Sequence, residues 1–147
     1  MDFMNFQLYT YVYMLNTFPN LLILGLLAPT ILRITAGLLF ARFGLLKLTK
    51  DKQSKIMFFE TIGLRPAIFW LWLVALIEII SGLFIFAGFL TQISSIIAGI
   101  IMFISIVIKI IKPKALPNTL DFYILFFVVF ISLILSGAGL FAFDMPL

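Results

Sequence analysis

The chain has 147 residues, of which 64% are hydrophobic and only 11% charged, and its formal net charge is +4. A soluble domain is usually about 25% charged and less than half apolar, so this composition indicates an integral membrane protein. There is no Cys and no His, which excludes disulfide relays, thiol catalysis, His-ligated haem and the common zinc sites, and we expect no metal.

In chain order, we predict an all-α fold: a four-helix transmembrane bundle with a short N-terminal interfacial segment. Residues 1–20 are aromatic and carry no charge after Asp2, which favours an interfacial helix, although alternating tyrosines would also suit a strand. Residues 21–147 form a single domain, because nearly every residue belongs to a span or a short connector. Each predicted span is close to the length of about 20 residues that crosses about 30 Å of hydrocarbon; the four are Leu21–Leu46, Pro66–Leu90, Gln92–Ile111 and Leu120–Phe143.

The basic residues predict the orientation of this bundle. Those in or beside the first and third loops are Lys47, Lys50, Lys52, Lys55, Arg65, Lys109, Lys112 and Lys114, whereas the opposite side has no Lys or Arg. The positive-inside rule therefore places these loops in the cytoplasm and both termini outside, in a multi-pass protein of the inner cell membrane. We expect the lysines to contact anionic membrane lipids and not nucleic acid.

Three ionisable residues lie within the predicted spans: Arg33, Arg42 and Glu78. Each costs about 2.5–3.5 kcal/mol at mid-bilayer, so Glu78 needs a partner. Arg33 lies 14 residues from Lys47, and Glu78 lies 13 residues from Arg65, which places both about 20 Å from the basic edge. Both residues share stripes of small residues, so we predict an Arg33–Glu78 ion pair. That pair fits two roles equally well: a structural contact that holds two helices in register, or a site for a polar head group.

Several motifs resemble the DoxX family of small four-helix membrane proteins. They are ILRITAGLLFARFGLLKL, IGLRPAIFWLWLVALIEIISGLFIFAGFLTQ and LSGAGLFAFD, and the resemblance covers about residues 28–145. The family pattern is matched at Arg33, Gly37, Phe40, Gly44, Lys47, Gly63, Leu64, Pro66, Glu78, Gly82, Gly88, Thr91, Ser136, Gly137, Gly139 and Asp144. Phe43 and Gln92 depart from it, since family members often carry His and a basic residue at these positions.

The resemblance implies an inner-membrane subunit associated with an oxidoreductase, in some relatives a thiosulfate:quinone oxidoreductase. Our first hypothesis is a quinone-facing subunit in which Arg33 polarises a carbonyl and Glu78 relays protons. Aromatic side chains would line the slot, namely Phe40, Trp72, Phe86 and Phe89. With no redox centre of its own, the chain is not expected to be catalytic alone, and electrons would come from a partner protein or a bound cofactor.

Two alternatives stay open. The chain can be a membrane scaffold or assembly protein without chemistry of its own, in which the buried ion pair is only a staple. A transporter ranks third, because few polar residues are available to line a path. A homo-oligomer is compatible with all three functions.

Overall fold

The described part of the chain consists of helices and short non-helical segments. The computed structural model describes residue 25, residues 27–50 and residues 52–144, and within them the helices are α2 (Leu27–Thr49), α3 (Lys52–Thr61), α4 (Ala67–Ala87), α5 (Thr91–Ile111) and α6 (Leu120–Ser136). The all-α prediction is confirmed, but the described residues hold five helices where we predicted four. The predicted interfacial segment, residues 1–20, lies outside the described residues.

The additional helix, α3, occupies the first basic loop. Its ten residues, KQSKIMFFET, are too short to cross a membrane, and its lysines suggested an irregular loop. Lys55 and Phe59 are nevertheless buried one helical turn apart, and Phe59 packs in a small apolar cluster with Ala67 and Leu71 of α4. A single apolar face is therefore enough to fold this segment against α4.

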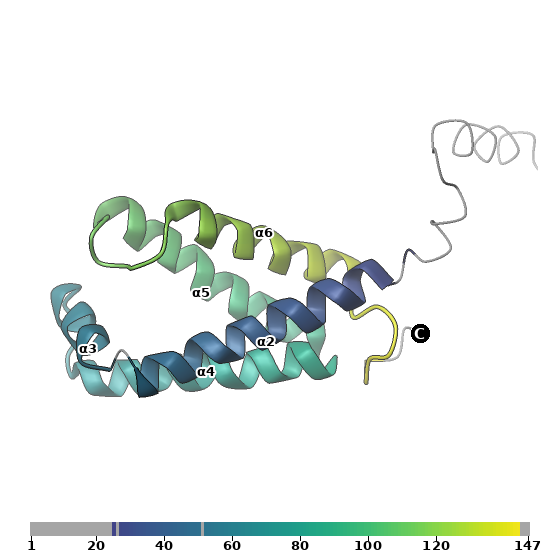
Figure 1. Cartoon of the computed structure of the whole chain (residues 1–147), viewed down its shortest axis with the longest axis horizontal. Helices are drawn as coiled ribbons and strands as arrows, with labels where there is room; N and C mark the ends of the chain where they lie inside the picture. The colour runs from purple at the N-terminus through teal and green to yellow at the C-terminus, as the bar shows by residue number, and fades with distance from the viewer. Residues whose placement is uncertain (1–24, 26, 51, 145–147) are drawn as a thin grey trace, which may run out of the picture.

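The long helices form two antiparallel pairs, α2 with α4 and α5 with α6 (Figure 1). Glycines set the distance within the first pair, because a Cβ on Gly82 would lie 2.5 Å from the backbone nitrogen of Ala41. A Cβ on Gly37 would likewise lie 2.6 Å from the backbone nitrogen of Phe86. Small residues thus let these backbones touch, as is common for membrane helices.

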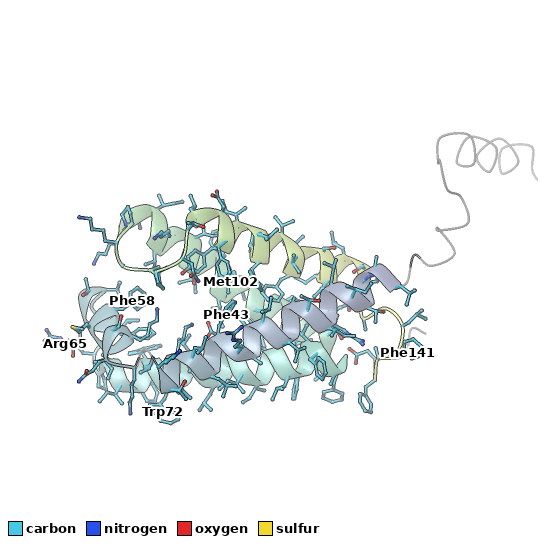
Figure 2. All side chains as sticks on the ribbon, in the orientation of Figure 1. Phe43, Phe58, Arg65, Trp72, Met102 and Phe141 are labelled. Carbon is cyan, nitrogen blue, oxygen red and sulfur yellow. The ribbon has the colours of Figure 1, made fainter. Side chains whose placement is uncertain are left out.

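Aromatic rings join the two pairs. Phe40 of α2 meets Phe130 of α6 edge to face, with ring centroids 5.1 Å apart. Phe43 meets Phe122 in the same way at 5.4 Å, so the position where family members often carry His is part of the aromatic packing. In Figure 2, Phe43 and Met102 point into the space between the pairs.

Helices α4 and α5 are each 21 residues long and apolar enough to cross a membrane. Only 33% and 28% of their most apolar windows are buried inside the protein, unlike the core helix of a soluble domain. Their exposed side chains are large and apolar, including Leu73, Ile80, Ile93, Ile100 and Phe103. Such surfaces suit contact with lipid, and α6 is a shorter apolar helix of 17 residues.

The last predicted span ends earlier than expected, at Ser136 instead of Phe143. Gly137 and Gly139 follow with φ values of 73° and 71°, a left-handed backbone that favours glycine and ends the helix. Residues 137–144 then turn back toward the junction of α4 and α5 (Figure 1), where the Asp144 backbone nitrogen donates to the Gly88 carbonyl at 2.8 Å.

Candidate functional site

Glu78 is 1% exposed, and its Oε1 forms an ion pair with the Nζ of Lys47 on α2. The predicted Arg33–Glu78 pair is therefore wrong. Glu78 does face α2, as its stripe of small residues indicated, but its basic partner lies about four turns farther along that helix than predicted.

The register between α2 and α4 explains the error. Gly44 lies against Ala75 and Glu78, while Gly37 lies against Gly82 and Phe86. Glu78 is thus opposite the Gly44 region of α2, within reach of a Lys47 side chain. The depth comparison treated Lys47 and Arg65 as level, whereas α4 begins beyond the end of α2 and leaves room for α3.

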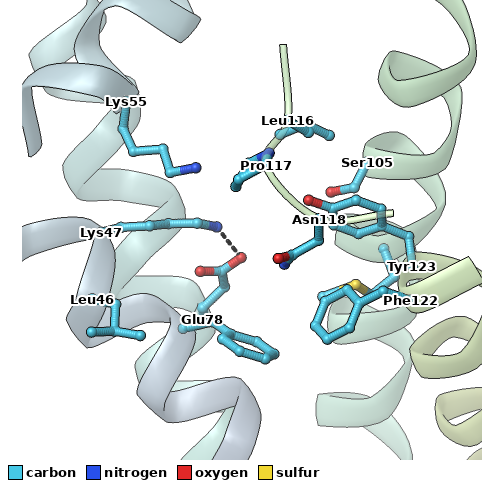
Figure 3. Close-up of a pocket in the computed structure, with 12 residues that line it drawn as sticks. Leu46, Lys47, Lys55, Glu78, Ser105, Leu116, Pro117, Asn118, Phe122 and Tyr123 are labelled. Carbon is cyan, nitrogen blue, oxygen red and sulfur yellow. Dashed lines mark hydrogen bonds and ion pairs between the residues drawn. The ribbon is translucent and has the colours of Figure 1, made fainter. Parts of the chain in front are cut away.

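The ion pair forms one wall of a cavity of about 190 Å³ between the two helix pairs. Figure 3 shows Lys47, Lys55 and Glu78 on one side, Ser105 and Tyr123 on the other, and Asn118 between them. Apolar side chains complete the wall, namely Phe43, Leu46, Met102, Leu116, Pro117 and Phe122. An apolar cavity of about 150 Å³ admits benzene, so this one has room for a single ring.

Polar groups converge on this cavity. Oε2 of Glu78 is buried and has no hydrogen-bond partner among the described residues, so it is an acceptor available to a ligand. Lys55 is close enough to interact electrostatically with Glu78, and Tyr123 is within hydrogen-bonding reach of Asn118. Two ammonium groups, one carboxylate, a phenol and an amide can therefore bind carbonyl or hydroxyl oxygens, and all but the amide can exchange protons with them.

Arg33 lies at the other end of α2 and has a different role. It is 2% exposed, and its Nη1 donates to the Ala138 carbonyl at 3.0 Å. Nη2 donates to the Phe141 carbonyl at 3.1 Å and to the Leu140 carbonyl at 3.5 Å. One turn away, the Thr30 hydroxyl accepts a bond from the Leu140 nitrogen at 2.8 Å. Arg33 thus fastens the segment after α6.

Asp144 completes this fastening at the start of α5. Its Oδ1 accepts from the Leu90 nitrogen at 2.9 Å and its Oδ2 from the Thr91 nitrogen at 2.6 Å, where the helix has unsatisfied N–H groups. Partial burial raises the pKa of Asp144, but these backbone donors and the nearby Arg33 outweigh it and hold the pKa below its ordinary value. The carboxylate is therefore ionised where it caps α5.

The predicted aromatic slot does not gather around Glu78. Phe40 is fully buried against α6, whereas Trp72, Phe86 and Phe89 are 44%, 40% and 46% exposed. Figure 2 shows Trp72 pointing away from the bundle. The exposed three lie on the outer surface of the bundle, and Glu78 is the one predicted site residue that lines the cavity.

Sequence reasoning missed Lys47, Lys55, Asn118 and Tyr123. Lys47 had a signal, because Phe40, Gly44 and Lys47 follow one helical face, yet its place beside a basic loop suggested orientation alone. Asn118 lies just before Thr119, the N-cap residue of α6, and that helix has no side-chain cap bond. Lys55 and Tyr123 had no such signal, because only the folded structure brings α3 and α6 to Glu78.

Long apolar helices whose large side chains are mostly exposed are typical of small helical membrane proteins. The DoxX family profile matches residues 28–109, so the chain belongs to the DoxX family. It is also similar to a protein of Bacillus subtilis (strain 168) named "Putative oxidoreductase CatD". The two are 31% identical over 114 residues, which cover 78% of this chain and 82% of the relative. No solved structure matches this chain.

Proposed function

We propose that this chain is a multi-pass membrane subunit of an oxidoreductase and that its Glu78 cavity binds the head group of a quinone. The observation that carries the proposal is the buried Glu78, paired with Lys47 on the wall of a ring-sized cavity, with one carboxylate oxygen left without a partner among the described residues. The oxidoreductase association is supported by membership of the DoxX family and by the relative's printed name.

The donors and acceptors of this cavity suit a quinone. A quinone supplies two-electron, two-proton chemistry when bound. Lys47, Asn118 and Tyr123 can donate to a carbonyl oxygen, and Oε2 of Glu78 can accept from a hydroxyl and relay its proton. Aromatic walls, among them Phe43 and Phe122, suit a flat ring. This site replaces Arg33 by Lys47 as the basic group beside Glu78.

The proposal includes the predicted topology. Four long helices, α2, α4, α5 and α6, would cross the inner membrane, with the basic loops in the cytoplasm and membrane lipids around the apolar faces. The cavity then lies in the cytoplasmic half, because Lys55 and the loop before α6 help to form it. Electrons would come from a partner oxidoreductase on that side.

A titration tests the binding site. The purified protein in mild detergent is titrated with a ubiquinone or menaquinone analogue, and Glu78→Gln is compared with Glu60→Gln, the same change at an exposed position of α3. A hydrogen bond to a charged group contributes about 1.5–3 kcal/mol, so Glu78→Gln should weaken binding at least about tenfold. Equal affinity of both variants and the unchanged protein would refute the proposed site.

A scaffold is the second candidate function, and the ion pair itself favours it. Lys47 and Glu78 join α2 to α4 and neutralise each other without a ligand. A scaffold predicts that Glu78→Gln lowers thermal stability while no quinone analogue binds either protein. Mass spectrometry of proteins and lipids that co-purify in mild detergent would then identify what the scaffold holds.

A further inference from the structure

A second cavity adjoins the Glu78 cavity and is almost entirely apolar. It has a volume of about 210 Å³ and lies among α3, α4 and α5. Its apolar walls include Phe58, Phe59, Ile62, Trp70, Val74 and Ile101. We refer to it as the α3 chamber, since α3 and the residue after it supply three of these six side chains.

The two cavities are neighbours and share part of their walls. Lys47, Lys55, Ser105 and Leu116 line both of them. Each cavity alone is smaller than the roughly 300 Å³ at the lower end of ligand pockets. A ligand that extends through both would therefore have a polar head beside Glu78 and an apolar portion in the α3 chamber.

We propose that the α3 chamber holds the first part of the hydrocarbon tail of the ligand whose head lies at Glu78. This inference rests on the proposed quinone site and specifies its substrate class: quinones with an isoprenoid or alkyl tail, not soluble ring compounds. Ile104, which also lines the chamber, is 51% exposed on the lipid-facing side of α5, so the rest of the tail can continue into the bilayer.

Both ends of α3 are fastened over the chamber. Nζ of Lys112 donates to the Thr61 carbonyl at 2.7 Å, which ties the last turn of α3 to the loop after α5. At the first turn, Nζ of Lys52 lies 5.9 Å from the ring centroid of Trp72. The helix therefore covers the chamber on the side of the basic loops, and the tail is directed toward α5 and lipid.

The two tryptophans of the chain allow a direct test. Trp70 lines the chamber, whereas Trp72 is exposed two residues away. Trp72→Phe leaves only the chamber tryptophan, and Trp70→Phe leaves only the outward one. Each variant is titrated in nanodiscs with a quinone whose alkyl tail carries bromine near the ring, and bromine quenches tryptophan fluorescence at short range. We expect saturable quenching of Trp70, and only the non-saturable quenching of lipid partitioning at Trp72.

Val74→Phe fills the chamber, and Leu73→Phe adds the same ring to the neighbouring lipid-facing position. Overpacking typically costs about 1–3 kcal/mol, so Val74→Phe should weaken binding of the tailed quinone about 5- to 150-fold, and Leu73→Phe should leave it unchanged. A gel-filtration profile that matches the unchanged protein shows that the variant has folded.

The outcomes separate this inference from the proposed function. One outcome is that the quinone binds tightly and depends on Glu78, that Val74→Phe leaves this binding unchanged, and that Trp70 shows no saturable quenching. This outcome keeps the quinone site and overturns the tail chamber. A second outcome is that a brominated alkyl alcohol quenches Trp70 saturably, that Val74→Phe blocks this quenching, and that no quinone binds specifically. This outcome supports the chamber and overturns the proposal that its ligand is a quinone. Saturable quenching at Trp72 equal to that at Trp70 overturns the chamber as well.

Discussion

Replacing Arg33 by Met should release residues 138–141 from the bundle. The change keeps a long side chain but removes donors that reach the Ala138 and Phe141 carbonyls at 3.0 and 3.1 Å. Hydrogen bonds to a charged group contribute about 1.5–3 kcal/mol each, so the lower value gives a loss of about 3 kcal/mol. The opening equilibrium of the segment should then rise about 150-fold.

Thiol labelling measures this opening, because the native chain has no Cys. A cysteine at Ala142, whose side chain packs near Gly88, reports when the segment leaves α4. Where opening and closing are fast, the rate of maleimide labelling follows the open population, so it should increase by the same factor.

Arg42 provides the matched control, since it lies on the same helix but is exposed. Arg42→Met should leave the labelling rate of the Ala142→Cys protein within a few-fold of its starting value. Similar labelling rates in the Arg33 and Arg42 variants would refute the fastening role of Arg33.

Three further predictions concern the ion pair, the helix contact and the cap. Lys47→Met should lower the free energy of unfolding by about 3–5 kcal/mol, because it leaves a buried carboxylate unpaired. Adding Glu78→Gln to this variant should recover part of the loss. If the losses of the two substitutions add in thermal melts, the pairing is contradicted. Gly82→Ala should destabilise the bundle by about 1–3 kcal/mol, since its Cβ meets the α2 backbone at 2.5 Å, whereas Gly99→Ala has its nearest contact at 3.9 Å and should be tolerated in the same melts. Because the folded pKa of Asp144 is lowered, its stabilisation is complete above the ordinary carboxyl pKa and is lost as pH falls through the folded value. Acid also lowers the thiolate fraction of any cysteine, so labelling at Ala142→Cys is expressed relative to that of free cysteine at the same pH. This relative rate should rise on acidification, and Asp144→Asn should remove that dependence.

The sequence was most informative where the apolar pattern was long. The four long helices follow from the length of the apolar runs. The small-residue contact between α2 and α4 and the inward direction of Glu78 follow from helical periodicity. The partner of Glu78 could not be predicted in this way, because it depends on how far α4 extends beyond the end of α2. That offset is set by α3, and the sequence did not reveal this helix because its single apolar turn is surrounded by lysines.

The cavity was less predictable than the helices. Its walls come from α2, α3, α4, α5, α6 and the loop before α6, which no local spacing brings together. For Arg33, the sequence indicated burial but not the hydrogen-bond partners, because its acceptors are backbone carbonyls. Carbonyl groups occur at every residue, so no side-chain pattern indicates which of them an arginine will bind.

The fastening of residues 138–141 also constrains biosynthesis. Arg33 precedes its acceptors by 105 residues in the case of Ala138, so the ribosome delivers the guanidinium long before the carbonyls exist. A charged side chain in the bilayer costs about 2.5–3.5 kcal/mol on insertion scales. A nascent chain arrested after α6 therefore holds an arginine whose carbonyl acceptors are still missing, which distinguishes an unfinished molecule from a finished one.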